Sequence, residues 1–155
     1  MTAQNGSGNN STALDIFLVE DHPIMHEMLI AFLEVTPGFD VCGSAESAEE
    51  AIELLKDAEP DLMLIDVSLP GMNGIDLVSH ISSTYPGLPC LMLSGHGENS
   101  YVRRALQAGA RGYVLKDDSV ELPTAMLTVL DGEIYLSKSV RGTSQLHRHR
   151  PRQRE

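Results

Sequence analysis

Long apolar runs, cysteine and tryptophan are scarce or missing in this sequence of 155 residues. No run approaches the roughly 18 consecutive apolar residues of a membrane-spanning helix, and the start MTAQNGSGNNST has neither the basic region nor the apolar stretch of an export signal. The two cysteines, Cys42 and Cys90, lie far apart in apolar strand-like segments, which fits reduced thiols better than a disulfide framework, and no metal-binding cysteine pattern exists. We expect a soluble cytoplasmic protein whose two thiols are reduced and buried.

Basic residues are also scarce over most of the chain. Six of the eleven lysines and arginines follow position 137, so residues 1–137 carry five bases against 21 of the 22 acids, a balance of −16. Such a surface repels the phosphates of nucleic acids instead of binding them. We therefore expect no direct nucleic-acid binding by the folded part.

What the sequence does contain is a repeated alternation of short apolar runs and helically spaced apolar residues, in a chain that is 42% hydrophobic. Alternation of this kind favours a mainly parallel sheet covered by helices on both faces. The predicted strands are Leu14–Val19, Phe39–Ser44, Leu62–Ile65, Cys90–Leu93 and Gly112–Leu115. The predicted helices are Pro23–Glu34, Ser47–Asp57, Gly74–Ser83, Asn99–Ala108 and Val120–Leu130. This pattern predicts an α/β fold with five strands and five helices.

Three segments follow from the composition. Residues 1–13 are a polar leader that we expect to be disordered, and residues 14–137 form one domain. Residues 138–155 lose apolar periodicity and gain Arg, His and Gln, which is typical of an exposed flexible tail or the remnant of a linker.

Charged and polar residues follow the predicted strands. In open parallel sheets ligands bind beyond the carboxyl ends of the strands, so these positions are informative. Three carboxylates, a hydroxyl and an ammonium group are expected to meet at that edge, namely those of Glu20, Asp21, Asp66, Ser94 and Lys116. Clustered carboxylates repel one another and need a cation, and Mg²⁺ prefers such oxygen ligands together with a phosphate. A carboxylate beside Mg²⁺ and a lysine is able to attack phosphorus and form an aspartyl phosphate.

Four stretches resemble the receiver domains of two-component response regulators: LVEDHP at 18–23, DLMLIDVSLPGMNG at 61–74, LMLSGHG at 91–97 and AGARGYVLKDD at 108–118. The resemblance covers about residues 14–137. It implies a doubly wound, flavodoxin-like parallel sheet in the strand order 2-1-3-4-5. It also implies that a sensor histidine kinase or a phosphotransfer protein donates the phosphoryl group, and that no membrane is involved.

The resemblance also assigns the site residues. Asp66 is similar to the phosphoacceptor, Lys116 to the phosphate-pairing lysine, and Ser94 and Tyr113 to the hydroxyl and aromatic switch residues. The metal ligands, for Mg²⁺ or Mn²⁺, correspond to Glu20, Asp21, Asp66 and the backbone carbonyl of Ser68. Taken singly, these residues have plainer interpretations: helix capping for the acids, a buried hydroxyl satisfied by the backbone, and a core aromatic. His22 and His96 lack metal-ligand spacing, so we expect them to serve local packing or loop hydrogen bonds.

The stretches GARGYVLKDDSV and DGEIYLS, at 109–120 and 131–137, resemble the NarL/FixJ (LuxR-type) subfamily of transcriptional regulators. That subfamily continues into a helix-turn-helix domain, and no amphipathic helix pair follows residue 137 here. Two outputs therefore stay open: control of a transcriptional output domain absent from this chain, or a free-standing receiver acting by protein contact. Phosphorylation is expected to switch the surface of the helix at 99–108, the strand at 112–115 and the last helix. Its charged groups suit a partner or a homodimer: Arg103, Arg104, Asp117, Asp118 and Glu121.

Two rival functions fit the residues less well. A phosphatase of the haloacid-dehalogenase type resembles this site but carries a second acid two positions after the nucleophile, where this chain has Ser68. A flavodoxin-like cofactor carrier has a Ser/Thr/Gly-rich first loop, whereas this loop is EDHP, whose charges repel an unchelated phosphate. We expect a phosphoacceptor signalling domain, not an enzyme, which catalyses its own phosphotransfer and slow autodephosphorylation. In addition, Asp117 follows Lys116 where many receivers have a cis proline, so we expect a trans bond there.

Overall fold

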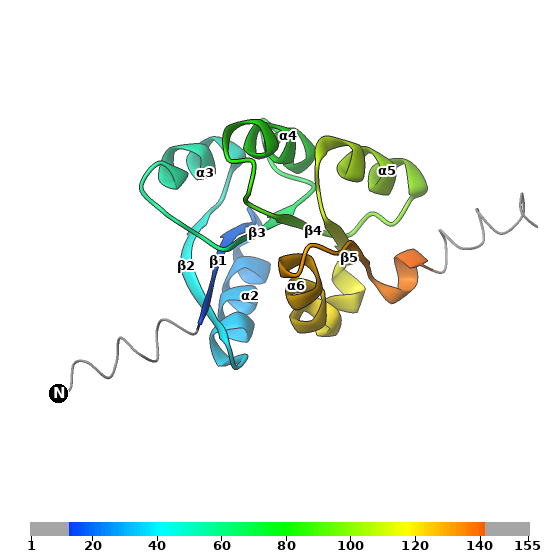
Figure 1. Ribbon diagram of the computed structural model, residues 1–155, viewed down its shortest axis with the longest axis horizontal. Helices are drawn as coiled ribbons and strands as arrows, with labels where there is room; N and C mark the ends of the chain where they lie inside the picture. The colour runs from blue at the N-terminus through cyan, green and yellow to red at the C-terminus, as the bar shows by residue number, and fades with distance from the viewer. Residues whose placement is uncertain (1–12, 142–155) are drawn as a thin grey trace, which may run out of the picture.

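The computed structural model describes residues 13–141, which form a parallel sheet between two layers of helices (Figure 1). The strands are β1 (Leu14–Val19), β2 (Phe39–Ala45), β3 (Leu62–Asp66), β4 (Cys90–Ser94), β5 (Gly112–Leu115) and β6 (Tyr135–Leu136). The helices are α2 (Pro23–Val35), α3 (Ala48–Leu55), α4 (Gly74–Thr84), α5 (Asn99–Ala108), the 3₁₀ helix η1 (Lys116–Glu121) and α6 (Leu122–Leu130). Residues 1–12 of the expected leader and 142–155 of the expected tail lie outside the described residues.

The strand order is β2-β1-β3-β4-β5-β6, with every neighbouring pair parallel. The predicted α/β class and the order 2-1-3-4-5 are confirmed. The sixth strand was not predicted, because its two residues are too few to show a period. Its position is decided by β5: Tyr135 pairs with Gly112 and Leu136 with Tyr113.

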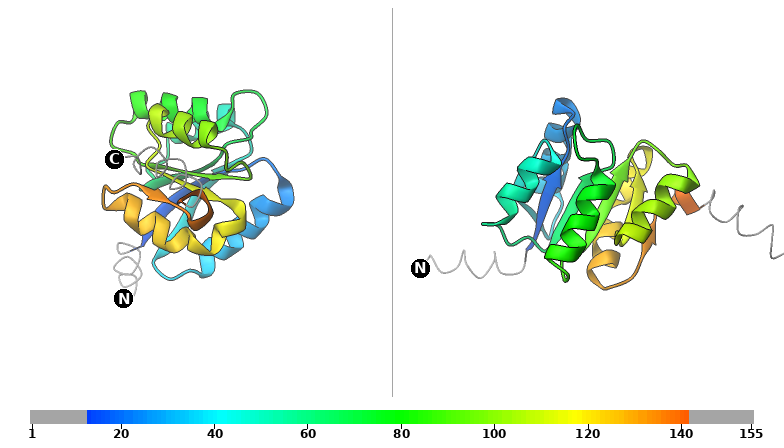
Figure 2. Two further views of the ribbon diagram at one scale, coloured as in Figure 1. Left: turned by 90° about the vertical axis from the view of Figure 1, so that its right-hand side faces the viewer. Right: turned by 90° about the horizontal axis from the view of Figure 1, so that it is seen from above.

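Helices cover both faces of the sheet. One face carries α3, α4 and α5, and the other carries α2 and α6 (Figures 1 and 2). Each interface has its own apolar core, and the central strands are buried throughout because successive side chains point into opposite cores. Burial on both faces explains why these strands are continuously apolar. No helix within residues 13–141 is long and apolar enough to cross a membrane.

Edge position corrects one prediction about the cysteines. Cys90, in the central strand β4, is buried, and burial raises the pKa of its thiol to about 12. Cys42 is exposed, because β2 lies at the edge of the sheet and alternate side chains there face solvent. Both thiols are free.

The first residues of the expected tail pack on the domain. Residues 138–141 form a helical turn, and Val140 is 1% exposed within the apolar core. Asp118 accepts hydrogen bonds from the backbone N–H and the hydroxyl of Ser139, at 3.0 and 3.1 Å. Glu121 accepts from the Tyr135 hydroxyl at 2.6 Å and from the Lys138 N–H at 3.1 Å. Two of the five charged groups expected to face a partner are therefore engaged within the chain.

Candidate functional site

Three carboxylates converge at the carboxyl ends of β1 and β3. Glu20 and Asp21 follow β1, Asp66 ends β3, and the two strands are neighbours in the sheet. One oxygen atom from each residue lies within 4.8 Å of the others. Glu20 is 1% and Asp66 4% exposed, and Asp21 is the most accessible of the three. The structure thus brings together the acidic residues that the strand ends predict.

Lys116 supplies positive charge to this cluster from the end of β5. Its Nζ lies 3.2 Å from Asp66 Oδ2 and 3.4 Å from Glu20 Oε1. The peptide bond to Asp117 is trans, as expected, and the chain turns there into η1. A single ammonium group thus faces two buried carboxylates, so negative charge remains in excess.

The excess charge perturbs the site's proton affinities. Burial and the negative charge of Asp66 raise the pKa of Glu20 to about 7. Burial opposes the charge on Lys116, but Asp66 and Glu20 outweigh it and raise the pKa of the ammonium group. Glu20 Oε1 is buried and has no hydrogen-bond partner among the described residues, although Lys116 lies nearby. An orphaned carboxylate oxygen in an all-oxygen donor set fits a divalent cation.

These protonation states predict a pH-dependent effect of Mg²⁺ on stability. Because the pKa of Glu20 is raised in the folded state, this residue stabilises the fold at low pH, and that contribution is lost as pH rises from 4.5 to about 7. Below about pH 7 Mg²⁺ must compete with the proton on Glu20, and above that pH it relieves the repulsion between the ionised carboxylates. We expect a larger Mg²⁺-induced rise in the melting temperature at about pH 8 than at about pH 5.5.

Thermal unfolding of wild type and Glu20→Gln, with Mg²⁺ or with EDTA, checks this expectation. The Gln variant lacks the titrating group, so its Mg²⁺ effect should be smaller and nearly independent of pH. Equal Mg²⁺ effects at both pH values in the wild type would contradict the assignment.

Ser94 and Tyr113, the two predicted switch residues, both contact His96 in the loop after β4. The Ser94 hydroxyl is buried and accepts a hydrogen bond from the His96 N–H at 2.9 Å. The Tyr113 ring is buried, and its hydroxyl donates to the His96 carbonyl at 2.5 Å. Burial raises the pKa of Tyr113 to about 12, which keeps the phenol protonated as a donor. A displacement of Ser94 would therefore reach Tyr113 through the backbone of one residue.

The histidines near the site have local roles, as the sequence suggests. The His96 ring stacks on Tyr101 with 4.7 Å between ring centroids. His22 is the N-cap of α2, where its Nδ1 accepts from the Met25 N–H at 3.5 Å. The alternative of Asp21 as the capping residue is therefore wrong, and the carboxylate of Asp21 belongs to the acidic cluster instead.

The loop between β3 and α4, residues 67–73, is held against the cluster by contacts that the sequence did not indicate. The Ser68 N–H donates to Asp66 Oδ1 at 3.1 Å. Glu49, at the start of α3, accepts from the Met72 N–H at 3.0 Å, and this bond lowers the pKa of its carboxyl. Gly71 has φ +70°, which favours glycine.

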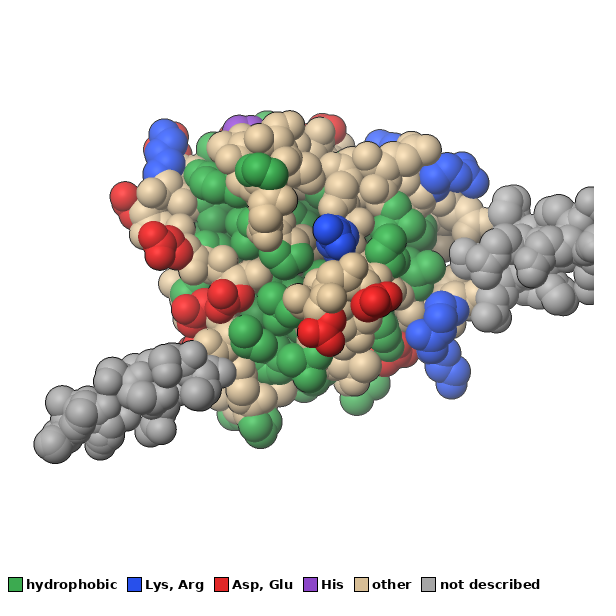
Figure 3. Space-filling view, viewed as in Figure 1, with side chains coloured by type: hydrophobic (Ala, Val, Ile, Leu, Met, Phe, Trp, Pro, Cys, Tyr) green, Lys and Arg blue, Asp and Glu red, His purple; other side chains and the backbone are tan. Residues whose placement is uncertain are grey.

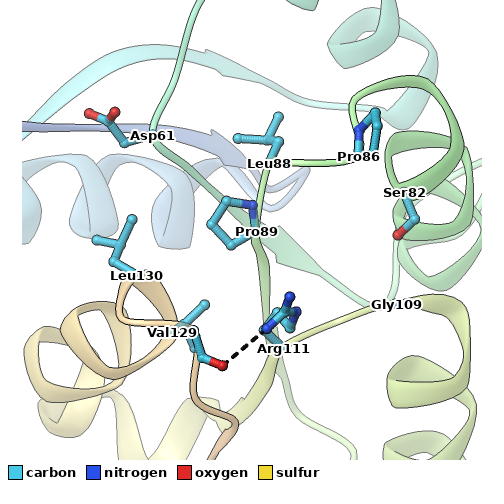
Figure 4. A pocket seen from close by; sticks show the side chains of 11 residues that line it. Asp61, Ser82, Pro86, Leu88, Pro89, Gly109, Arg111, Val129 and Leu130 are labelled. Carbon is cyan, nitrogen blue, oxygen red and sulfur yellow. Dashed lines mark hydrogen bonds between the residues drawn. The ribbon is translucent and has the colours of Figure 1, made fainter.

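A cavity of about 440 Å³ lies at the amino ends of β3, β4 and β5, whereas the acidic cluster lies at the carboxyl ends of the strands (Figure 4). Its charged groups are used within the chain. Asp61 accepts a hydrogen bond from the Asp15 N–H at 2.7 Å, and Arg111 donates to the Gly132 carbonyl at 3.2 Å. Because it lies at the other ends of the strands, the cavity is separate from the acidic cluster.

Comparison with known proteins agrees with this geometry. Residues 16–127 match the family model of the response regulator receiver domain. The chain is 38% identical over 122 residues to the DNA-binding transcriptional activator DevR/DosR of Mycobacterium tuberculosis, covering 78% of this chain and 56% of that protein. It is 33% identical over 135 residues to the nitrate/nitrite response regulator NarL of Escherichia coli, covering 85% and 62%. The chain thus spans little more than half the length of these relatives.

Solved structures include a LuxR-family two-component response regulator from Aurantimonas sp. SI85-9A1, with a TM-score of 0.84 and 33% identity over 88% of this chain and 98% of that one. The receiver domain of the response regulator NarL from Mycobacterium tuberculosis has a TM-score of 0.73 and 32% identity, covering 78% and 98%. The fold, together with the acidic cluster at the carboxyl ends of β1 and β3, defines a flavodoxin-like phosphoacceptor signalling domain. This chain belongs to the response regulator receiver domain family, and within it to the NarL/LuxR type, whose domains serve phosphorylation-dependent signalling.

Proposed function

We propose that Asp66 accepts a phosphoryl group from the phosphohistidine of a sensor histidine kinase or a phosphotransfer protein. The observation that carries this proposal is the position of Asp66. Its carboxylate is 4% exposed, lies 3.2 Å from Lys116 Nζ and shares a cluster with Glu20 and Asp21. Of the three carboxylates, Asp66 is the one on a central strand. In the order of the sheet, β3 lies between β1, which precedes Glu20 and Asp21, and β5, which precedes Lys116.

Glu20, Asp21, Asp66 and the carbonyl of Ser68 are the proposed ligands of Mg²⁺ or Mn²⁺. Such an ion, when bound, neutralises the carboxylates and stabilises charge on the phosphoryl oxygens. In the transfer, an Asp66 oxygen forms the new bond to phosphorus while the phosphorus–nitrogen bond of the donor breaks, and the imidazole leaves. Lys116 stabilises negative charge on the phosphoryl group, and the Ser94 hydroxyl donates a hydrogen bond to it.

The domain catalyses its own phosphotransfer but is not a turnover enzyme. Hydrolysis of an aspartyl phosphate requires an activated water, and position 68 is a serine where a hydrolase would place a second acid. Slow autodephosphorylation is therefore expected, as a signal requires.

The proposed output runs through Ser94 and Tyr113 to the surface of α5, β5 and α6. Tyr113 lies in β5, which pairs with β6, and Tyr113 and Val140 belong to the same apolar core. The named relatives are transcriptional regulators, which favours transcriptional control, and a structure of two RcsB dimers bound to two parallel DNAs favours a homodimer. On the face in Figure 3, described Lys and Arg side chains lie apart and form no continuous basic patch, in keeping with a receiver that does not itself bind DNA.

The proposal predicts that phosphorylation requires a divalent cation. Incubation with acetyl phosphate and Mg²⁺, followed by intact mass, should show one phosphate per chain within minutes, and EDTA should suppress the gain. Mn²⁺ should substitute for Mg²⁺. A gain of equal rate in EDTA would contradict the proposed ligands.

A further inference from the structure

His26, in the second turn of α2, hydrogen-bonds to the ends of two strands. Its Nδ1 lies 2.6 Å from the backbone carbonyl oxygen of Glu20, which follows β1. Its Nε2 lies 3.0 Å from the hydroxyl oxygen of Ser44 in β2. Both contacts are partly buried, and together they link α2 to β2 and to the residue that follows β1.

The partners determine where the ring carries its hydrogen. A carbonyl oxygen only accepts, so Nδ1 must be the donor to Glu20. Nε2 accepts from the Ser44 hydroxyl when the ring is neutral, and the hydroxyl is able to accept in turn when the ring is charged. The bond to the Glu20 carbonyl is therefore present in either protonation state.

The Glu20 carbonyl belongs to the peptide unit that joins Glu20 to Asp21. That unit is planar, so holding its oxygen orients the backbone of both residues. On the other side, the Glu20 N–H donates to the Ala45 carbonyl at 3.0 Å. The Glu20 carboxylate in turn accepts from the His22 N–H at 3.1 Å. Of these three hydrogen bonds, the one from His26 is the one that reaches the peptide unit between Glu20 and Asp21. It therefore fixes how the backbone of Asp21 is oriented relative to Glu20.

We propose that His26 is a positioning residue for the acidic pair, acting through the Glu20 carbonyl to hold the two carboxylates in their cation-binding arrangement. This inference rests on the proposed function, since it concerns the same cation site. His26 touches neither the carboxylates nor the reacting atoms. Contacts that orient ligands in this way commonly contribute about 10- to 100-fold to metal affinity.

Two variants separate the two contacts of the ring. The amide nitrogen of His26→Asn occupies the place of Nδ1 and retains the donor to Glu20. That of His26→Gln occupies the place of Nε2, so it retains the contact to Ser44 and loses the one to Glu20. Glutamine is the better helix former of the two, so an effect on α2 stability alone favours Gln over Asn. Ser44→Ala serves as a third variant that removes only the contact to Ser44.

The readouts are the Mn²⁺ dissociation constant, from titration followed by electron paramagnetic resonance of free Mn²⁺, and the melting temperature in EDTA. We expect His26→Gln to weaken Mn²⁺ binding about tenfold, and His26→Asn and Ser44→Ala to stay within about threefold of wild type. His26→Gln should melt at or above the temperature of His26→Asn.

Binding by His26→Gln that matches wild type, or that is no weaker than binding by His26→Asn, would overturn the positioning role. Failure of wild type itself to bind Mn²⁺ would instead overturn the proposed cation site, and the positioning role with it. The wild-type titration therefore distinguishes the two failures.

Discussion

Replacing Lys116 by methionine should slow phosphorylation by acetyl phosphate about 100- to 1,000-fold, the loss typical when a preorganised charge is removed from a site of developing negative charge. Methionine keeps the length and apolar stem of the side chain but not its ammonium group. The two carboxylates that Lys116 Nζ faces, at 3.2 and 3.4 Å, are both almost fully buried. The carboxylates then lose the positive charge that Lys116 supplies, and the approach of a further anion becomes more costly.

The same variant should be less stable in buffer without divalent cations, by about 2 kcal/mol at pH values where both carboxylates are ionised. The lysine side chain is 24% exposed, which keeps this figure below that of a fully buried pair. Lys56→Met is the matched control, because Lys56 pairs with Glu53 at 3.2 Å with both side chains more than half exposed. Its effect should be below about 1 kcal/mol, with no change in phosphorylation. A Lys116→Met protein phosphorylated at the wild-type rate would contradict this role.

Adding one methyl group at Gly74 should destabilise the fold by about 3 kcal/mol. Gly74 begins α4, and its N–H donates to the Val67 carbonyl at 2.9 Å. A Cβ there would overlap the Asp66 carbonyl oxygen and would lie 2.9 Å from Val67 Cα. Both are backbone atoms, so no side chain is able to turn aside. The methyl group must push β3 and α4 apart at the residue that carries the proposed phosphoacceptor.

Urea unfolding of Gly74→Ala and Gly87→Ala measures this effect. A Cβ at Gly87 meets nothing within 4 Å, and Gly87 is not among the glycines with positive φ. The control should stay within about 1 kcal/mol of wild type. Equal stability of the two variants would show that the close approach of β3 and α4 is not required. Gly74→Ala should also accept phosphate more slowly, because the Asp66 backbone must move.

Most of the fold and the core of the site could be predicted because strong local patterns determine them. Strands buried on both faces are apolar throughout, and helices covering a sheet show apolar spacing, so element types and their order follow from the sequence. The strand order then brings Glu20, Asp21 and Asp66 together without any detail of side-chain packing. This is why the acidic cluster could be predicted from the sequence.

The features that were missed depend on tertiary contacts. Pairing of Tyr135 and Leu136 exists because β5 presents a free edge, and burial of Val140 follows from that pairing. The contact of His26 with Glu20 and Ser44 requires α2 to pack on the face of the sheet formed by β1 and β2, and no spacing in the sequence indicates it. Glu49 reaches Met72 for a similar reason.

The role of Asp66 as phosphoryl acceptor underlies the whole of the proposed function. Its most direct test is the intact mass of wild type and Asp66→Asn after incubation with acetyl phosphate and Mg²⁺. We expect one added phosphate on wild type, removable by hydroxylamine as an acyl phosphate should be, and none on the Asn variant, which should still fold. An equal gain on Asp66→Asn, or no gain on folded wild type that binds Mg²⁺, would contradict it.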